Sequence, residues 1–327
     1  MYEDLSENKR EIEKLLPLPD EAQKKLNAQL VLDLVCAGCS FDGGSFTRKE
    51  VQDILEEDKT VAGHALKEHI TVLNAAHVWN FIKEESTRHT GRALDEKDVR
   101  DIHRIAVRAV FDEDAGMYRG IDLKFGTTER EMPSPAKVQR LMSDFGMWLY
   151  TAQSLHPIAM GAEAHLKLMA IQPFAQRNST VARSLMNLIA MRHGYPPVLF
   201  LRREKKEYWQ ALEKAVFEND RTDYDKLVAR AARRSMEAYK KASVVKEFVA
   251  TDPDPYFLRI GGLAKESGER VSTIRFWTSL GLLETAGKTS AGYVLYSSDA
   301  LETIQRLRKL KDERYTLDEI REIVHAQ

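Results

Sequence analysis

The 327-residue chain has only two cysteines and no apolar run of the ~18 residues that a membrane-spanning helix needs. Scarce cysteine favours a reducing compartment, and the acidic, polar start MYEDLSENKREIEKL is unlike a signal peptide. The 49 basic and 50 acidic residues leave no overall positive charge, so nucleic-acid binding would need a local basic patch. We therefore expect a cytoplasmic protein without membrane contact.

Familiar catalytic and metal-binding patterns are missing too. The sequence has no Walker loop, no Ser-His-Asp arrangement and no internal repeat. Cys36 and Cys39 form a C-x-x-C pair without a second pair, which excludes a four-cysteine zinc site within the chain, and we expect no metal. A redox pair at a helix N-terminus is conceivable, but two small residues on a buried helix segment are the favoured interpretation.

Helical signals dominate what is there. Thr47 followed by Glu50 is a capping box, Ser134-Pro135 is typical of a helix start, and an apolar helical period begins at Asn178. The segment GIDLKFGTTEREMP alternates apolar and polar residues, which predicts a short β-flap. The fold class is therefore mostly α.

A domain boundary is predicted at ATDPDPY, where two prolines follow a long basic-faced helix. We place a helical domain at 1–250 with its core at about 20–235, a linker at 251–256 and a second domain at 257–327. The basic face is expected to be solvated, although a role flanking DNA is the alternative. It consists of Arg230, Arg233, Arg234, Lys240 and Lys241.

The second domain begins with LRIGGLAKESGERVSTIRFWTSLGLL, which reads as helix, turn, helix, with Gly268 ending the first helix and Ser272 as N-cap of the second. An ordinary αα-hairpin has the same spacing. The following GYVLYSSDALETIQRLRKLKDERYTLDEIREIV makes the whole segment resemble the MerR family of winged helix-turn-helix regulators. The resemblance implies binding of double-stranded DNA. The implied contacts are Ser272, Thr273, Arg275 and Phe276 on the recognition helix, Lys288 and Tyr293 on the wing, and Arg306 on the next helix.

Two departures from that family stand out. Val294 follows the wing tyrosine, where the family usually has arginine, so one phosphate contact is lost. The long C-terminal dimerisation helix of the family is also absent before Gln327. Any homodimer is therefore expected to form through the first domain.

The first domain resembles Fic domains, the Fido fold that transfers AMP or similar groups to protein hydroxyls. Segments that match in order include LDEKDVRDIHRIAV, AGMYRG, AHLKLMAIQPFAQRNSTVARSLMNLIAMRHGYPPVLF and KEYWQALEKA. The family loop reads H-P-F-x-(D/E)-G-N-G-R-x-x-R. Its histidine is the general base, its acid holds magnesium, and its glycines and arginines hold phosphates.

That loop is degenerate here. Pro173, Phe174, Asn178 and Arg183 remain, whereas the other motif positions are Gln172, Gln176, Arg177, Ser179 and Thr180. A glutamine cannot act as a general base, and a neutral amide is a poor magnesium ligand. Side chains at the former glycines obstruct the backbone cradle and disfavour positive φ. We expect no catalysis and no required cofactor, although ATP or another nucleotide could still bind at the helix N-terminus.

Two further positions follow from the Fic resemblance. The family's inhibitory helix carries (S/T)-x-x-x-E-(G/N), and the matching GCSFDGG places Asp42 at the glutamate, so Asp42 and Arg183 are predicted to form a buried inhibitory-type pair. His165, seven residues before Gln172, is expected to pack and to form hydrogen bonds rather than to replace the base.

We therefore expect a DNA-binding transcriptional regulator whose catalytically silent Fic-like domain serves sensing of an unidentified ligand, dimerisation or partner binding. The first alternative is a Fic-type protein nucleotidyltransferase with a divergent active site. The second is an interaction scaffold. The degenerate loop argues against the enzyme, since fold alone does not establish activity, and the wing argues against the scaffold.

Overall fold

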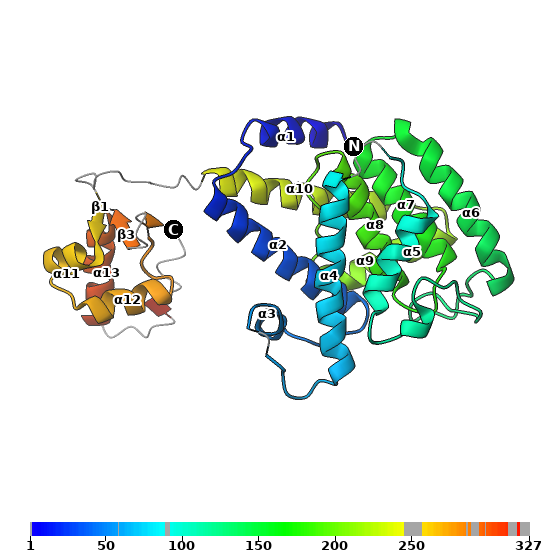
Figure 1. The fold of residues 1–327 in the computed structure, drawn as a ribbon. Coiled ribbons are helices and arrows are strands. Elements are labelled where there is room, and N and C mark those ends of the chain that lie inside the picture. Colours follow the sequence, from blue (N-terminus) through cyan, green and yellow to red (C-terminus); the bar gives the residue numbers. More distant parts are fainter. Residues whose placement is uncertain are drawn as a thin grey trace. The chain divides into compact units, whose positions relative to one another are not determined.

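The computed structural model describes residues 2–57, 59–88, 92–244, 257–285, 287–288, 294–297, 299–312 and 319–320. It divides into two compact units, Met1–Val244 and Val245–Gln327, each with its own hydrophobic core (Figure 1). The chain is mostly helical, which confirms the predicted fold class. The predicted linker at 251–256 lies outside the described residues. None of the described helices has both the length and the apolar character of a membrane-spanning segment.

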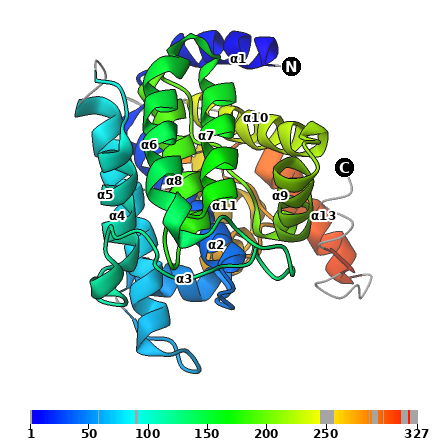
Figure 2. The same cartoon turned by 90° about the vertical axis from the view of Figure 1, so that its right-hand side faces the viewer.

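The first unit is a bundle of α-helices arranged around one central helix. The helices are α1 Glu3–Glu13, α2 Asp20–Phe41, α3 Arg48–Glu56, α4 Leu66–Arg88, α5 Glu96–Val107, α6 Pro135–Thr151, α7 Pro157–Ile171, α8 Asn178–Arg192, α9 Lys205–Phe217 and α10 Thr222–Val244. Short 3₁₀ turns lie at Asp112–Asp114, Ala152–Ser154 and Arg202–Glu204. Helix α8 is central, because α4, α5 and α7 all pack against it. Figure 2 shows α6, α7 and α8 running alongside one another.

Close packing of α7 against α8 fixes the two ends of the loop that joins them, residues 172–177. On α8, Leu185 and Leu188 are fully buried. Gly161 on α7 permits the close approach, because a Cβ at this position would lie 3.0 Å from the carbonyl oxygen of Met186. Any larger residue would force two buried helices apart, and packed interiors tolerate such expansion poorly.

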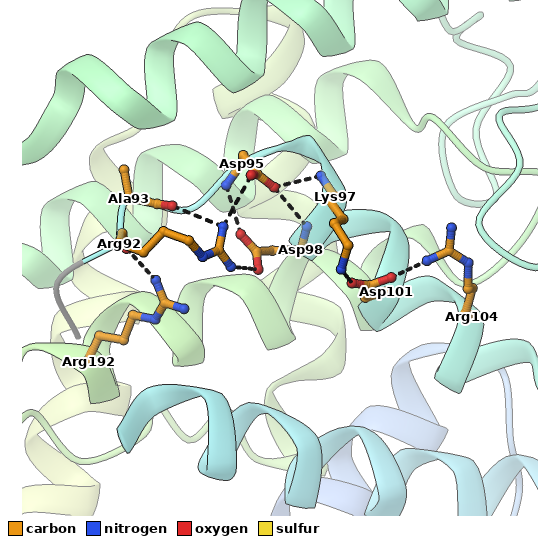
Figure 3. A network of polar contacts seen from close by, with 8 residues as sticks. All are labelled: Arg92, Ala93, Asp95, Lys97, Asp98, Asp101, Arg104 and Arg192. Atoms are coloured by element: carbon orange, nitrogen blue, oxygen red, sulfur yellow. Dashed lines mark hydrogen bonds and ion pairs between the residues drawn. The ribbon is translucent and has the colours of Figure 1, made fainter. Parts of the chain in front are cut away.

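Side-chain caps fix where several helices begin. Thr47 and Glu50 form the predicted capping box of α3, with Glu50 accepting from the Thr47 N–H at 2.7 Å. At α5, Asp95 and Asp98 form a second capping box, which Arg92 joins through both carboxylates (Figure 3). Ser134 does precede α6, but its side chain makes no capping hydrogen bond. The capping contacts of α3 and α5 satisfy backbone N–H groups that a helix leaves unpaired at its start.

The predicted β-flap is present only in reduced form. Residues 121–132 double back as a hairpin-like loop with one isolated β-bridge, between Lys124 and Glu131. The Phe125 N–H donates to the Arg130 carbonyl at 2.9 Å and the Met132 N–H to the Leu123 carbonyl at 3.0 Å. The alternation of apolar and polar residues therefore predicts the chain reversal correctly, but two regular strands do not form among these residues.

The basic face of α10 is partly exposed, as the sequence interpretation expects, but four of its five cations also form ion pairs within the first unit. Arg230 and Arg234 both pair with Glu204, which is 6% exposed. Arg233 pairs with Asp4 at 2.6 Å and Lys240 with Glu11, so α1 is held on α10 by ion pairs. The partners come from segments far away in the sequence, which local periodicity cannot reveal.

The second unit has the helices and the small sheet of a winged helix-turn-helix. Its elements are β1 Phe257–Arg259, α11 Ile260–Ser267, α12 Val271–Ser279, β2 Gly287–Lys288, β3 Val294–Ser297 and α13 Asp299–Asp312. The antiparallel sheet has the order β1-β3-β2. Leu263, Ile274 and Trp277 are buried in the core of this unit. Gly268 ends α11 with φ +72°, as predicted, but the N-cap of α12 is Arg270 rather than Ser272.

Candidate functional site

The loop between α7 and α8 is bounded by two residues in the left-handed region. Gln172 follows α7 with φ +44°, and Arg177 precedes α8 with φ +61°. Arg177 thus adopts positive φ although a side chain at this position disfavours it. For a residue other than glycine this conformation costs roughly 1–2 kcal/mol, which the surrounding contacts must offset.

Those contacts hold the loop backbone from both sides. The side chain of Asn178 accepts from the Phe174 N–H at 2.9 Å and donates to the Phe174 carbonyl at 2.7 Å. Arg119, which is 5% exposed, donates to the Gln172 carbonyl at 2.7 Å and to the Ile121 carbonyl at 2.7 Å. Asn178 thus closes the loop, and Arg119 ties it to the hairpin-like loop at 121–132.

The N-terminus of α8 is occupied by a carboxylate of the chain itself. Asp42, which follows α2, accepts hydrogen bonds from the hydroxyls of Ser179 and Thr180. The guanidinium groups of Arg177 and Arg183 each lie 3.5 Å from its carboxylate oxygens. The predicted Asp42–Arg183 pair is thus present in the structure. Local sequence patterns do not reveal the hydroxyl donors, because Asp42 lies more than 130 residues away from them.

The protonation of Asp42 follows from these neighbours. Burial alone would raise the pKa of this carboxyl group, but Arg183, the two hydroxyl donors and Arg177 outweigh burial and leave the pKa below its ordinary value of 3.8. The group is therefore an anion at neutral pH. It takes the position at a helix N-terminus where a phosphate would otherwise be favoured.

Arg183 is held in a buried aromatic setting. Its guanidinium lies over Phe41 at 5.1 Å and over Tyr208 at 5.8 Å from the ring centroids, and it donates to Ser179 at 2.8 Å. Phe41 and Tyr208 stack on one another with centroids 4.7 Å apart. Arg183 is 8% exposed, so these contacts leave it little freedom to reach a ligand.

His165 continues this network into the core. Nε2 lies 2.8 Å from the Tyr208 hydroxyl and Nδ1 2.9 Å from the Tyr224 hydroxyl, which also donates to the Ala162 carbonyl. One arrangement satisfies every group: Nδ1–H donates to Tyr224, and Nε2 accepts from Tyr208. Burial, reinforced by the charge of Arg183, lowers the pKa of His165 to about 3. The ring is thus neutral and structural, as the sequence analysis predicted.

The loop forms the floor of a cleft of about 980 Å³, a size suited to a small molecule. Residues 123–128 of the hairpin-like loop and residues of α9 also line the cleft, as do Gln172 and Gln176. Gln172 is 6% exposed and carries an amide where a base would stand. Among the described residues, no group of three His, Cys, Asp or Glu side chains could hold a metal ion.

Cys36 and Cys39 lie buried on α2 as free thiols. Burial raises the pKa of Cys36 to about 11 and that of Cys39 to about 12. Thiolates are the reactive form in disulfide exchange, so this setting favours the packing interpretation over a redox pair.

The candidate nucleic-acid interface is the outer face of α12. Ser272, Arg275 and Phe276 are exposed, and Thr273 is half-buried. The Phe276 ring is 46% exposed. Arg306 is exposed on α13. Lys288 lies in β2, but its side chain and the whole of Tyr293 lie outside the described residues, so the wing contacts stay predictions.

Family comparisons agree with both parts of this geometry. Residues 93–190 match the model of the Fic/DOC family, and residues 258–327 match the model of the MerR HTH family regulatory proteins. The chain therefore combines a Fic/DOC domain with a MerR-type helix-turn-helix domain.

Individual relatives cover the Fic part. The chain is 28% identical over 208 residues to the protein adenylyltransferase Fic of Nematostella vectensis, covering 63% of this chain and 48% of that protein. It is 28% identical over 222 residues to the protein of the same name from Culex quinquefasciatus, covering 67% and 44%. The chain thus spans less than half the length of these curated relatives.

Solved structures show the same fold. The Fic-1 structure from C. elegans, residues 134–508, aligns with a TM-score of 0.61 at 25% identity, covering 72% of this chain and 71% of that one. A Fic family protein from Desulfovibrio desulfuricans G20 aligns with a TM-score of 0.58 at 19% identity over 90% of this chain and 95% of that one. The second likeness concerns the fold alone.

Proposed function

We propose that the protein is a DNA-binding transcriptional regulator in which the Fic domain transfers no nucleotide and serves sensing, dimerisation or partner binding. The observation that carries the regulatory part is the MerR-type domain with the exposed polar N-terminal half of α12. In helix-turn-helix proteins this part of the second helix lies in the major groove. Ser272 and Arg275 are exposed there and available to base edges.

The proposal that the Fic domain is catalytically silent is supported by two residues of its loop and by Asp42, which follows α2. Gln172 has no titration near neutral pH and cannot accept the proton of a target hydroxyl. Gln176 offers a neutral amide where a hard cation prefers a carboxylate. Asp42 already occupies the donors at the start of α8. A triphosphate would have to displace this buried carboxylate, so we propose that no nucleotide or metal is needed.

Selection of sequences from a random duplex pool by the intact protein tests the DNA-binding part. Arg275→Ala should weaken specific binding by ~1–3 kcal/mol if it contacts a base edge. Lys288→Ala should weaken binding to all sequences and reduce the salt dependence by about one ion. Lys137→Ala, which removes an exposed charge on α6, is the control. No enrichment at low salt would overturn the proposal.

The enzyme remains the second candidate, favoured by the relatives that are named protein adenylyltransferases and by retained Asn178 and Arg183. We expect no transfer of label from α-labelled ATP, GTP, CTP or UTP to the protein or to a lysate. Gln172→His alone should not restore transfer. A combined variant, with motif residues restored and Asp42→Gly, is the positive control. Magnesium-dependent labelling by the wild type would favour the enzyme.

A further inference from the structure

The cleft of the first unit contains cations that the rest of the fold leaves without partners. Its lining includes Arg203, Lys205 and Lys206, at the junction of the 3₁₀ turn Arg202–Glu204 and α9. Within the described part of the chain, no ion pair or hydrogen bond is made by the side chains of these three residues. Their neighbours in the sequence are acidic, so this lack of pairing requires an explanation.

The explanation lies in how the segment RREKKE divides between two sides. Glu204 pairs with Arg234 at 2.6 Å, and Glu207 pairs with Arg230 at 2.6 Å, so both carboxylates are directed to α10. The three cations are left on the side of the cleft. The carboxylates that line the cleft are also neutralised, since Glu213 pairs with Arg130 at 3.0 Å and Asp42 is held by arginines.

This arrangement is unfavourable for the protein alone. Lys205 and Lys206 are the first two residues of α9, and positive charges at a helix N-terminus are repelled by the helix dipole. They also repel one another and Arg203. A bound anion would remove both penalties, because it would meet the helix N-terminus and several cations at once.

We propose that Arg203, Lys205 and Lys206 form a binding site for a phosphorylated small molecule with at least two negative charges. The site lies at the α9 end of the cleft and does not use the N-terminus of α8, where Asp42 is bound. A small ligand fits better than a polymer, because residues 123–128 of the hairpin-like loop line the same cleft, and Phe125 packs on Trp209 of α9 with ring centroids 5.7 Å apart. The inference gives the sensing role of the proposed function its ligand class, and it rests on that function.

Titration calorimetry with inorganic pyrophosphate on the full-length protein, without magnesium, tests the site. Arg203→Gln and Lys206→Gln should each weaken binding by about tenfold, the factor for one charged hydrogen bond. Lys137→Gln on α6, outside the cleft lining, is the matched control and should bind as the wild type does. Because both sites are exposed, the variants should melt at the same temperature as the wild type or slightly higher without ligand.

Several results would overturn the proposal. The first is absence of pyrophosphate binding by the wild type at low salt. The second is binding by the Arg203→Gln and Lys206→Gln variants that is as tight as that of the wild type. The third is loss of binding in Arg177→Gln, which would place the anion at the N-terminus of α8. Tighter binding of a duplex DNA through the same cations would also overturn it, in favour of a polymer. Sequence selection from the DNA pool is measured independently, so its failure would reject the regulator without affecting the anion site.

Discussion

At the scale of single residues, Asp42 explains how the loop persists without the groups that the family uses. The substitutions that remove a glycine and an arginine place hydroxyls at 179 and 180, and both donate to this carboxylate. Arg177 adds a second guanidinium to that of Arg183. An anion supplied by the chain thus satisfies a helix N-terminus that would otherwise attract a ligand.

We expect Asp42→Asn to lower the free energy of unfolding by about 3 kcal/mol, because it leaves the buried guanidinium of Arg183 and the partly buried one of Arg177 without their anion. The pKa of Asp42 is below its ordinary value, so the wild type keeps this contribution above about pH 4 and loses it as pH falls further. Urea unfolding at pH 7 and pH 3 measures both effects. Asp223→Asn breaks an exposed pair with Lys214 and should cost less than about 1 kcal/mol. Equal costs for the two variants would contradict the buried pair.

The buried side chain of His103 gives the stability of the protein a second, separate pH dependence. His103 stacks on Phe174 with centroids 3.8 Å apart, and its Nδ1 accepts from the Gly116 N–H at 3.0 Å. Burial lowers the pKa of His103 to about 4. The unfolded chain therefore takes up protons below about pH 6.5 that the folded protein takes up only near pH 4, so stability falls as pH decreases through this window.

His103→Gln should remove one titrating group and reduce that slope by about 1.4 kcal/mol per pH unit. Glutamine retains an oxygen that can accept from Gly116. Urea unfolding at pH 5, 6 and 7 measures the slope, and His77→Gln, at an exposed position on α4, is the control. A slope unchanged by His103→Gln would show that this imidazole is not held neutral by burial.

At the scale of elements, local signals predicted helix boundaries well and tertiary partners poorly. The capping box at Thr47, the start of α8 at Asn178 and the stop at Gly268 were all correct, because each depends on a few neighbouring residues. The start of α12 was misplaced by two residues. The donors to Asp42 and the acidic partners of α10 were missed, since their contacts join segments that are distant in the sequence.

The loop itself provides an element-scale prediction. Asn178→Ala removes one buried donor and one buried acceptor that close the loop on Phe174, so the free energy of unfolding should fall by about 2–3 kcal/mol. Hydrogen exchange should quicken at the Phe174 amide, which loses its acceptor. Asn187→Ala on the same helix also loses a buried contact, with the Val198 N–H, and is the control. Quickened exchange at Phe174 in both variants would mean that Asn178 has no local role.

At the scale of the whole molecule, the two units have separate cores and separate tasks in the proposed function. The first unit includes α1 as an integral part, because Leu5 and Ile12 are buried in its core and Tyr2 donates to Asp225. Its N-terminal helix is therefore already used within the chain. Any contact between copies that involves this unit must use other surfaces, or the outer side of α1.

Recognition of two DNA half-sites about 34 Å apart requires two copies of α12 related by a two-fold axis. We propose that the first unit, the larger of the two, supplies the dimer contact. Light scattering should then give a dimer for the full chain and for residues 1–244, and a monomer for residues 257–327. The measurement needs a concentration series, because a dimer dissociates on dilution. A dimeric second unit beside a monomeric first unit would contradict this assignment and place the two-fold axis in the DNA-binding domain.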